Sequence, residues 1–193
     1  MILILAGIPG SGKSTVLNVL KSEFPSINIV NYGEMMLQEA ALQGLERDTI
    51  RKLPIEQQLK IGLSASNKIS QTTHPLTIVD THACIKTPIG FCPGISLPIL
   101  NSLNPKGFIL VHSSPLIILE RRKNDQSRKR DNENVSDLAL HQELTRTFLV
   151  SASILTGAVL CIVNNDSEDI SENMQPLRNF IESISQNSLL SYC

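Results

Sequence analysis

The sequence predicts a three-layer α/β fold in which helices cover both faces of a five-stranded parallel sheet. Five short apolar runs rich in β-branched residues recur along the chain, and amphipathic stretches with helical spacing lie between them. The runs are nearly continuous rather than alternating, which is typical of parallel strands buried on both faces of a sheet. Strands that alternate with helices in this way are joined by right-handed crossovers.

The chain has the size and composition of one globular domain. It has 193 residues, of which 41% are hydrophobic, and this excludes a wholly disordered chain. Its 17 Lys and Arg residues nearly balance its 18 Asp and Glu residues, which argues against a protein that coats nucleic acid or an anionic membrane. We therefore expect a single domain over residues 1–193, with neither a membrane nor a nucleic acid among its partners.

The elements follow one another in regular order. The predicted strands are 2–6, 27–30, 76–80, 108–112 and 158–163. The predicted helices between them are 13–22, 33–43, 54–72, 114–122 and about 137–155. A closing helix carries Ile170, Met174, Leu177, Ile181 and Ile184 on one stripe, and Pro176 belongs in its first turn.

One long uncharged segment, 147–165, needs an explanation other than a membrane span. Ser151, Ser153, Thr156 and Gly157 interrupt it, and its apolar part is short for a bilayer. We interpret it as the end of a helix, a cap at Gly157 and a buried strand. The chain starts without the basic residues and long apolar stretch of a secretory signal, so we expect a cytoplasmic protein.

Two segments break the alternation of strands and helices. The first is 45–51 with its following helix, which is too long for a plain crossover, and the second is the polar segment 121–137. We expect both to lie over the carboxyl edge of the sheet, where ligands of such folds bind.

The strongest motif is GIPGSGKS at residues 7–14, which matches GxxxxGK[ST] between an apolar strand and a helix. Its glycines let backbone N–H groups close around phosphate oxygens, and the helix N-terminus adds partial positive charge. We expect Lys13 to reach the β- and γ-phosphates and the Ser14 hydroxyl to ligate Mg²⁺. The motif thus predicts a nucleoside triphosphate bound with Mg²⁺. The predicted triphosphate-binding residues are Gly7, Ile8, Pro9, Gly10, Ser11, Gly12, Lys13, Ser14 and Thr15.

Asp80 is the candidate second residue of the metal site. It ends the apolar run 76–80, and a carboxylate at the end of a neighbouring parallel strand can hold Mg²⁺ directly or through water. The alternative is an Asp that caps a turn.

A basic segment supplies candidate cations for phosphoryl transfer. Six of the 17 basic residues fall between positions 121 and 130, namely Arg121, Arg122, Lys123, Arg128, Lys129 and Arg130. Phosphoryl transfer needs several cations around the transferred group, and the planar fork of Arg holds two phosphate oxygens. The alternatives are a solvated face and an RNA-binding patch, and the lack of aromatic residues weighs against RNA.

Arg47 and Arg51 form a second candidate phosphate site. They lie four residues apart, so a helix would place both on one face, where they could clamp one phosphate. The alternative is an exposed helix with an ion pair between Asp48 and Arg51. No carboxylate stands out as a general base for a hydroxyl acceptor, which favours an acceptor that is already ionised. His82 and His141 are the possible exceptions, although each is more often a structural residue.

The ordered set of motifs resembles the archaeal-type adenylate kinases, a family of P-loop nucleoside monophosphate kinases, over nearly the whole chain. Its most specific members are VDTH-x₃-KTP-x-G, from residue 79, and RDxxRKL, from residue 47. Further matches are the phosphate loop at 7–15, VNYGEMM at 30–36, the arginines of the basic segment and LTGA at 155–158.

The resemblance implies a P-loop NTPase fold and reversible transfer of the γ-phosphoryl group of ATP to AMP, giving two ADP. It implies a monophosphate-binding insert over about 31–73 and a short lid over about 123–136. Lys13, Arg121, Arg122, Arg128 and Arg130 would then be catalytic, and Ser14 and Asp80 would hold Mg²⁺. The implied AMP-binding residues are Gly33, Met36, Arg47, Arg51, Thr81 and His82. Members of the family are typically cytoplasmic, and a homotrimer is implied.

Two other functions remain open at this point. The first is an adenylate-kinase-like ATPase that acts as a ribosome-assembly or switch factor, since it would share the phosphate loop and the Asp-x-His sequence. The second is a small-molecule kinase that acts on a hydroxyl group, for which an evident base is missing.

Overall fold

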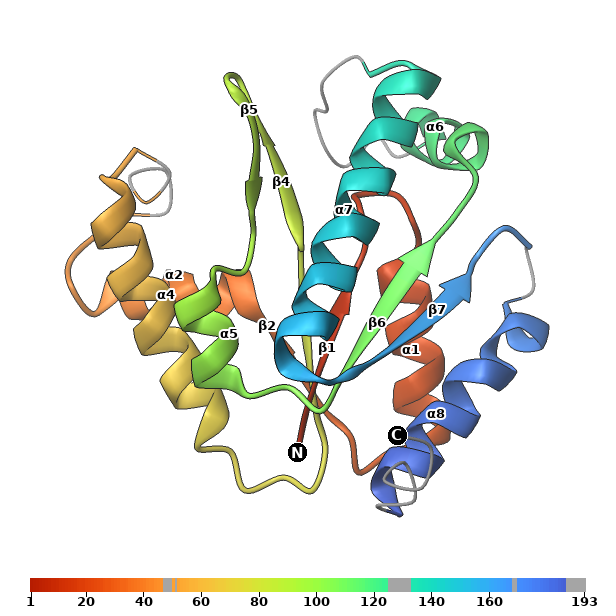
Figure 1. Cartoon of the computed structure of the whole chain (residues 1–193), viewed down its shortest axis with the longest axis horizontal. Helices are drawn as coiled ribbons and strands as arrows, with labels where there is room; N and C mark the ends of the chain where they lie inside the picture. The colour runs from red at the N-terminus through yellow and green to blue at the C-terminus, as the bar shows by residue number, and fades with distance from the viewer. Residues whose placement is uncertain (47–49, 51, 125–132, 168–169, 187–193) are drawn as a thin grey trace.

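A computed structural model describes residues 1–46, 50, 52–124, 133–167 and 170–186. Its main sheet confirms the predicted fold class, with five parallel strands in the order β2-β3-β1-β6-β7 between two layers of helices (Figure 1). These strands are β1 (Ile2–Ala6), β2 (Asn28–Asn31), β3 (Thr77–Thr81), β6 (Gly107–His112) and β7 (Val159–Asn164).

The central strand β1 is buried on both faces, as its continuous apolar sequence predicts. Leu3 and Leu5 pack in one core cluster, with residues of α1 (Lys13–Glu23) and α8 (Gln175–Ser185). Ile2 and Ile4 pack in the opposite cluster, whose helices are α2 (Tyr32–Ala41), α4 (Ile55–Ser70), α5 (Leu97–Leu103) and α7 (Val135–Thr156). The two sheet faces therefore have separate aliphatic cores.

Glycine and proline mark the ends of two helices, as the sequence predicts. Gly157 ends α7 in the left-handed conformation with φ 68°, and β7 follows, as expected for the uncharged segment. Pro176 lies in the first turn of α8, which confirms its predicted place, and a short 3₁₀ helix, η1 (Ser171–Met174), precedes it. In the part of the chain that the structure describes, no helix is long and apolar enough to cross a bilayer.

The last strand corrects one expectation. We expected a buried strand over 158–163, but β7 is the edge strand of the sheet, and Val159 and Ile162 are exposed. An edge strand has a neighbour on one side only, so an apolar sequence alone does not ensure burial.

A hairpin and a helix between β3 and β6 were not predicted. Strands β4 (Cys84–Thr87) and β5 (Gly90–Pro93) pair antiparallel in a separate two-stranded sheet, followed by α5. The hairpin projects from the body of the molecule (Figure 1). Ile89 at its turn is 99% exposed. Helix α6 (Pro115–Asn124) and α7 flank the predicted lid segment.

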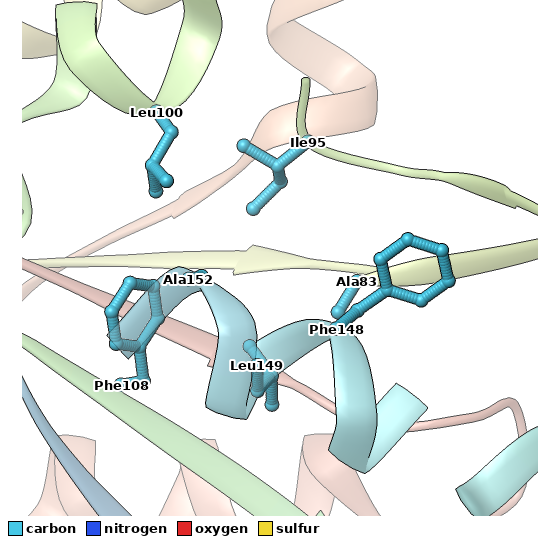
Figure 2. A pocket seen from close by; sticks show the side chains of 7 residues that line it. All are labelled: Ala83, Ile95, Leu100, Phe108, Phe148, Leu149 and Ala152. Carbon is cyan, nitrogen blue, oxygen red and sulfur yellow. The ribbon is translucent and has the colours of Figure 1, made fainter. Parts of the chain in front are cut away.

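A small void lies between the sheet and helices α5 and α7. It has a volume of about 30 Å³ and is lined only by apolar side chains (Figure 2), those of Ala83, Ile95, Leu100, Phe108, Phe148, Leu149 and Ala152. A space of this size is far too small for a nucleotide. The phosphate-loop motif lies elsewhere, at the carboxyl end of β1.

Candidate active site

The phosphate-loop motif joins the carboxyl end of β1 to the start of α1. Its neighbour β3 is in register with β1 so that Asp80 lies opposite Leu5 and Thr81 lies opposite Ala6. The loop, Asp80 and the residues after β3 therefore meet at one edge of the sheet, as the sequence predicts.

Close contacts explain two of the loop glycines. Gly12 has φ 90°, which favours glycine, and a Cβ there would overlap the amide of Asn165. A Cβ on Gly7 would lie 2.6 Å from both the Val111 carbonyl oxygen and Ser11 Oγ. The loop is thus packed tightly against β6 and the segment after β7.

The backbone carbonyls of the loop are engaged by donors from several elements. Arg122 Nε donates to the Pro9 oxygen at 2.8 Å, and Asn165 Nδ2 donates to the Ser11 oxygen at 2.9 Å. The other engaged carbonyls are those of Gly7 (Lys13 Nζ, 3.1 Å), Ile8 (Ser11 N, 3.1 Å) and Gly12 (Val16 N, 3.2 Å). With these oxygens bound to protein donors, the remaining N–H groups of the loop are suited to an anion.

Asp80 combines burial with an oxygen that lacks a hydrogen bond. Its Oδ2 accepts from Asn31 Nδ2 at 3.0 Å, while Oδ1 is buried and has no partner among the described residues. Burial raises the pKa of Asp80, and Lys13 and the Asn31 hydrogen bond oppose that rise. An unsatisfied carboxylate oxygen on the strand beside the phosphate loop fits a hydrated Mg²⁺ ion.

His82 and His141, the two candidate histidines, lie in different surroundings. His82 Nε2 lies 3.4 Å from Lys13 Nζ, so His82 belongs to the phosphate-loop site. His141 is buried on α7, with Nε2 3.2 Å from the Cys84 carbonyl oxygen and its ring centroid 5.4 Å from that of Phe91. Burial lowers the pKa of His141, which favours the neutral ring that a structural residue needs.

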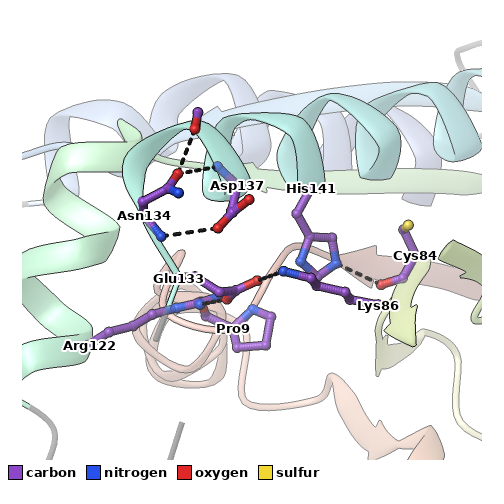
Figure 3. Close-up of polar contacts among 9 residues, drawn as sticks. Pro9, Cys84, Lys86, Arg122, Glu133, Asn134, Asp137 and His141 are labelled. Carbon is purple, nitrogen blue, oxygen red and sulfur yellow. Dashed lines mark hydrogen bonds and ion pairs between the residues drawn. The ribbon is translucent and has the colours of Figure 1, made fainter. Parts of the chain in front are cut away.

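Arg121 and Arg122 reach the loop from the end of α6. Arg121 Nη1 donates to Ser113 Oγ at 3.1 Å, and the Ser113 hydroxyl in turn donates to the Asn165 carbonyl at 2.7 Å. Arg122 forms an ion pair with Glu133, whose other oxygen accepts from Lys86 Nζ at 3.0 Å (Figure 3). The end of α6 is thus connected to the phosphate loop, to the segment after β7 and to the hairpin.

The structure brings many of the predicted site residues together. The loop residues, Asp80, His82, Arg121 and Arg122 lie at the same edge. Gly33 is in the first turn of α2, and Thr81 is buried at the end of β3. Met36 packs against the small apolar cluster of helices α2 (Tyr32–Ala41) and α4 (Ile55–Ser70), which we call the α2–α4 region. The predicted residues Arg47, Arg51, Arg128 and Arg130 lie outside the described residues.

Sequence reasoning missed three residues of the site: Lys86, Glu133 and Asn165. The polar residues Asn164, Asn165 and Asp166 follow the predicted strand 158–163, and this pattern resembles the one that revealed Asp80. Lys86 belongs to the motif VDTH-x₃-KTP-x-G, but nothing in the sequence indicates what its side chain does. Glu133 carried no local signal, because its partners lie in other elements.

Comparisons with known proteins find similar sequences over most of the chain. A family model described as an AAA domain matches residues 6–139. Adenylate kinase of Thermoplasma volcanium is 41% identical over 165 residues, which is 84% of this chain and 90% of that protein. Adenylate kinase of Methanothermobacter thermautotrophicus is 38% identical over 184 residues, which is 94% of this chain and 99% of that protein.

Solved structures show the same fold at low sequence identity. Shikimate kinase from Bacteroides thetaiotaomicron has a TM-score of 0.60 and 12% identity, covering 94% of this chain and 98% of its own. A gluconokinase from Sinorhizobium meliloti has a TM-score of 0.52 and 12% identity, covering 99% of this chain and 97% of its own. At this identity the likeness concerns the fold alone.

Proposed function

The chain belongs to the adenylate kinase family, and from this premise we propose that it transfers the γ-phosphoryl group of ATP reversibly to AMP, giving two ADP. The observation that carries the proposal is the phosphate loop, whose Pro9 and Ser11 carbonyls accept hydrogen bonds from Arg122 and Asn165. Such a loop is built for the phosphates of a nucleotide.

The donor side consists of the loop residues 7–15. We propose that their N–H groups hold the ATP phosphates and that Lys13 contacts the β- and γ-phosphates. Ser14 and Asp80 would hold Mg²⁺, and the unsatisfied Oδ1 of Asp80 supports this assignment. The bound metal would supply positive charge against the phosphate oxygens.

The transferred group requires cations rather than a base. AMP presents an ionised phosphate as the nucleophile, so positioning and charge neutralisation are enough. We assign this task to Arg121 and Arg122 and, outside the described residues, to Arg128 and Arg130. The guanidinium groups of Arg121 and Arg122 lie beside the phosphate loop, which supports the assignment.

The acceptor side is proposed to lie in the insert at about 31–73, with the lid at about 123–136 closing over the reaction. Gly33, Met36, Thr81 and His82 would line the AMP site, and Arg47 and Arg51 would bind its phosphate. The register supports this placement, because Asn31, directly before α2, lies opposite Asp80. AMP bound there would have its phosphate near the donor site.

Two further proposals rest on the family. We propose a cytoplasmic location and a homotrimer. Large apolar side chains exposed on α7 support an oligomer, namely Leu140, Val150, Ile154 and Leu155. Light scattering of the purified protein measures the oligomeric state, and a monomer at every concentration would contradict the trimer.

An acceptor panel tests the reaction. Purified protein with ATP and Mg²⁺ is offered AMP, GMP, CMP or UMP separately, and diphosphate products are followed by chromatography. We expect AMP to be the best acceptor. Absence of diphosphate from every acceptor would contradict a nucleoside monophosphate kinase, and binding of ribosomal RNA at physiological salt would then favour the ATP-driven assembly factor.

A pair of arginine variants tests the acceptor assignment. Arg51→Ala should lose about 100-fold or more in kcat/KM for AMP, because a bidentate phosphate contact is removed. Arg146, an exposed arginine of α7, provides the matched control, and Arg146→Ala should stay within about twofold of wild type. Unchanged kinetics of Arg51→Ala toward AMP would remove Arg51 from the site.

A further inference from the structure

Two contacts on different sides hold the guanidinium group of Arg122. Its Nε donates to the Pro9 carbonyl at 2.8 Å, and its Nη1 pairs with Glu133 Oε2. The side chains of Arg122 and Glu133 are only 9% and 11% exposed. A buried ion pair of this kind restricts the rotamers of a long side chain much more than a surface pair does.

Glu133 is the point at which three separate elements meet. Its Oε2 binds Arg122 of α6, its Oε1 accepts from Lys86 Nζ of β4 at 3.0 Å, and the residue itself directly precedes the N-cap of α7 (Figure 3). That cap is firm, because Asn134 and Asp137 exchange hydrogen bonds in a capping box. The backbone next to Glu133 is therefore anchored by α7.

The charges of the cluster formed by Lys86, Arg122 and Glu133 favour an ionised Glu133. Burial opposes ionisation, but the hydrogen bonds and charges of Lys86 and Arg122 outweigh it, so the pKa of Glu133 lies below its usual value. One carboxylate between two cations leaves a net positive charge. The cluster can thus stand beside a phosphate chain without repelling it.

Among the described residues, these two contacts leave further N–H groups of Arg122 without a protein acceptor. A guanidinium has five N–H groups, and the contacts to Pro9 and Glu133 use Nε–H and one Nη1–H. The other N–H groups are then oriented by the plane of the fork. A cation that is oriented in advance loses no ordering entropy when charge develops on the phosphoryl group.

We propose that Glu133 is a positioning residue for phosphoryl transfer, which acts through Arg122 by fixing its guanidinium against the phosphate loop at Pro9. The inference rests on the proposed function. Lys86 has a secondary part, since it holds the second carboxylate oxygen and is itself 40% exposed. Glu133 does not touch the substrate.

Kinetics of four single variants and one double variant test the proposal. Glu133→Gln should lower kcat by about 10- to 100-fold and change KM for ATP and AMP by less than about threefold, since an interaction of the transition state is lost. Glu133→Asp should recover part of kcat, and Lys86→Met should lose less than about fivefold. Arg122→Met should abolish the effect of Glu133→Gln, so that the double variant is no slower than Arg122→Met alone.

Glu23→Gln is the matched control, because Glu23, at the end of α1 away from the phosphate loop, forms an exposed ion pair with Arg178 of α8. It removes the same charge, yet kcat should stay within about twofold of wild type. A kcat for Glu133→Gln within that same margin, measured well below its melting temperature, would overturn the proposal. Multiplicative effects of Glu133→Gln and Arg122→Met would also overturn it.

A second measurement does not depend on activity. Arginine Nε–H signals are recorded by ¹⁵N-edited NMR, and the signal of Arg122 is identified by its loss in Arg122→Met. We expect slow hydrogen exchange of this group in the wild type and in Glu23→Gln, and fast exchange in Glu133→Gln. Equal protection in all three would refute the inference. A wild-type protein that fails to phosphorylate AMP would instead refute the proposed function and leave this readout valid.

Discussion

The phosphate loop and the α2–α4 region both follow strands at the carboxyl edge of the sheet, but they are held in different ways. The loop is held by distant residues, since Arg122 lies 113 positions from Pro9 and Asn165 lies 154 positions from Ser11. Helices α2 and α4 also pack on the sheet, but side-chain hydrogen bonds and an ion pair join these two helices directly to each other. Tyr32 donates to the Gly62 carbonyl at 3.0 Å, and Glu39 pairs with Lys68 at 2.6 Å.

The two regions also differ in their apolar packing. Ile8 of the loop packs against Ile118 and Leu138, which belong to the helices that flank it. The α2–α4 region has a small cluster of its own around Ala40, Ile50 and Ile61. The shape of the loop therefore depends on residues from distant parts of the chain, whereas the insert has internal contacts in addition to its packing on the sheet. Changes to the loop anchors should affect the donor, and changes inside the insert should affect stability or the acceptor.

The largest effect on the donor side should come from Lys13→Ala. We expect a loss of about 10³-fold or more in kcat/KM, because the principal cation at the β- and γ-phosphates is removed. The control is Lys21→Ala, at an exposed position of the same helix, which should be close to wild type. A Lys13→Ala enzyme within about tenfold of wild type would contradict the role of the loop.

Asp80→Asn should separate activity from stability. We expect kcat to fall by about 100-fold as the metal-binding carboxylate is lost, while the free energy of unfolding rises by about 1 kcal/mol. Burial raises the pKa of Asp80 above its ordinary 3.8, although Lys13 and Asn31 oppose the rise. The folded state therefore binds this proton more tightly than the unfolded state does.

Because the pKa of Asp80 is raised in the folded state, the stability of the wild type and of Asp80→Asn should depend differently on pH. Raising the pH through the raised pKa of Asp80 should cost the wild type stability, and the variant should lack this loss. Thermal unfolding of both proteins from pH 4 to pH 7 measures the difference. A variant that is less stable than wild type at pH 7 would show that ionised Asp80 stabilises the fold.

Asn165→Ala should give a smaller effect that is confined to the donor. The Ser11 carbonyl loses its donor and the loop relaxes near Gly12, so KM for ATP should rise by about tenfold. KM for AMP should stay within about twofold of wild type. Asn179→Ala, an exposed change on α8, is the control. Equal rises in both KM values would indicate that the anchor supports the whole site rather than the loop.

The smallest effect should come from the insert. Tyr32→Phe removes the hydrogen bond to the Gly62 carbonyl and should lower the free energy of unfolding by about 1 kcal/mol. We expect kcat and KM for ATP to remain unchanged, because the contact lies within the α2–α4 region. Denaturant unfolding and steady-state kinetics check both parts, and a rise in KM for ATP would break the distinction between the two regions.

The same contrast explains how far the sequence could predict the molecule. The loop motif, Asp80 and the five strands follow from local patterns, namely a fixed spacing and continuous apolar runs. The hairpin β4–β5 was missed because its short strands pair with each other away from the sheet and carry no clear alternation. Glu133 was missed because its partners lie in other elements, and the role of Asn165 depends on Ser11, which is 154 positions away. Strand β7 was expected to be buried, but it is the edge strand of the sheet.

The most direct test follows the γ-phosphoryl group itself. Purified protein, Mg²⁺ and ATP labelled with ³²P at the γ-position are incubated with and without AMP. Transfer between nucleotides predicts label in the β-phosphate of ADP that appears only when AMP is present, with two ADP formed per ATP consumed. Label released as inorganic phosphate at the same rate with or without AMP would contradict the account and indicate an ATPase.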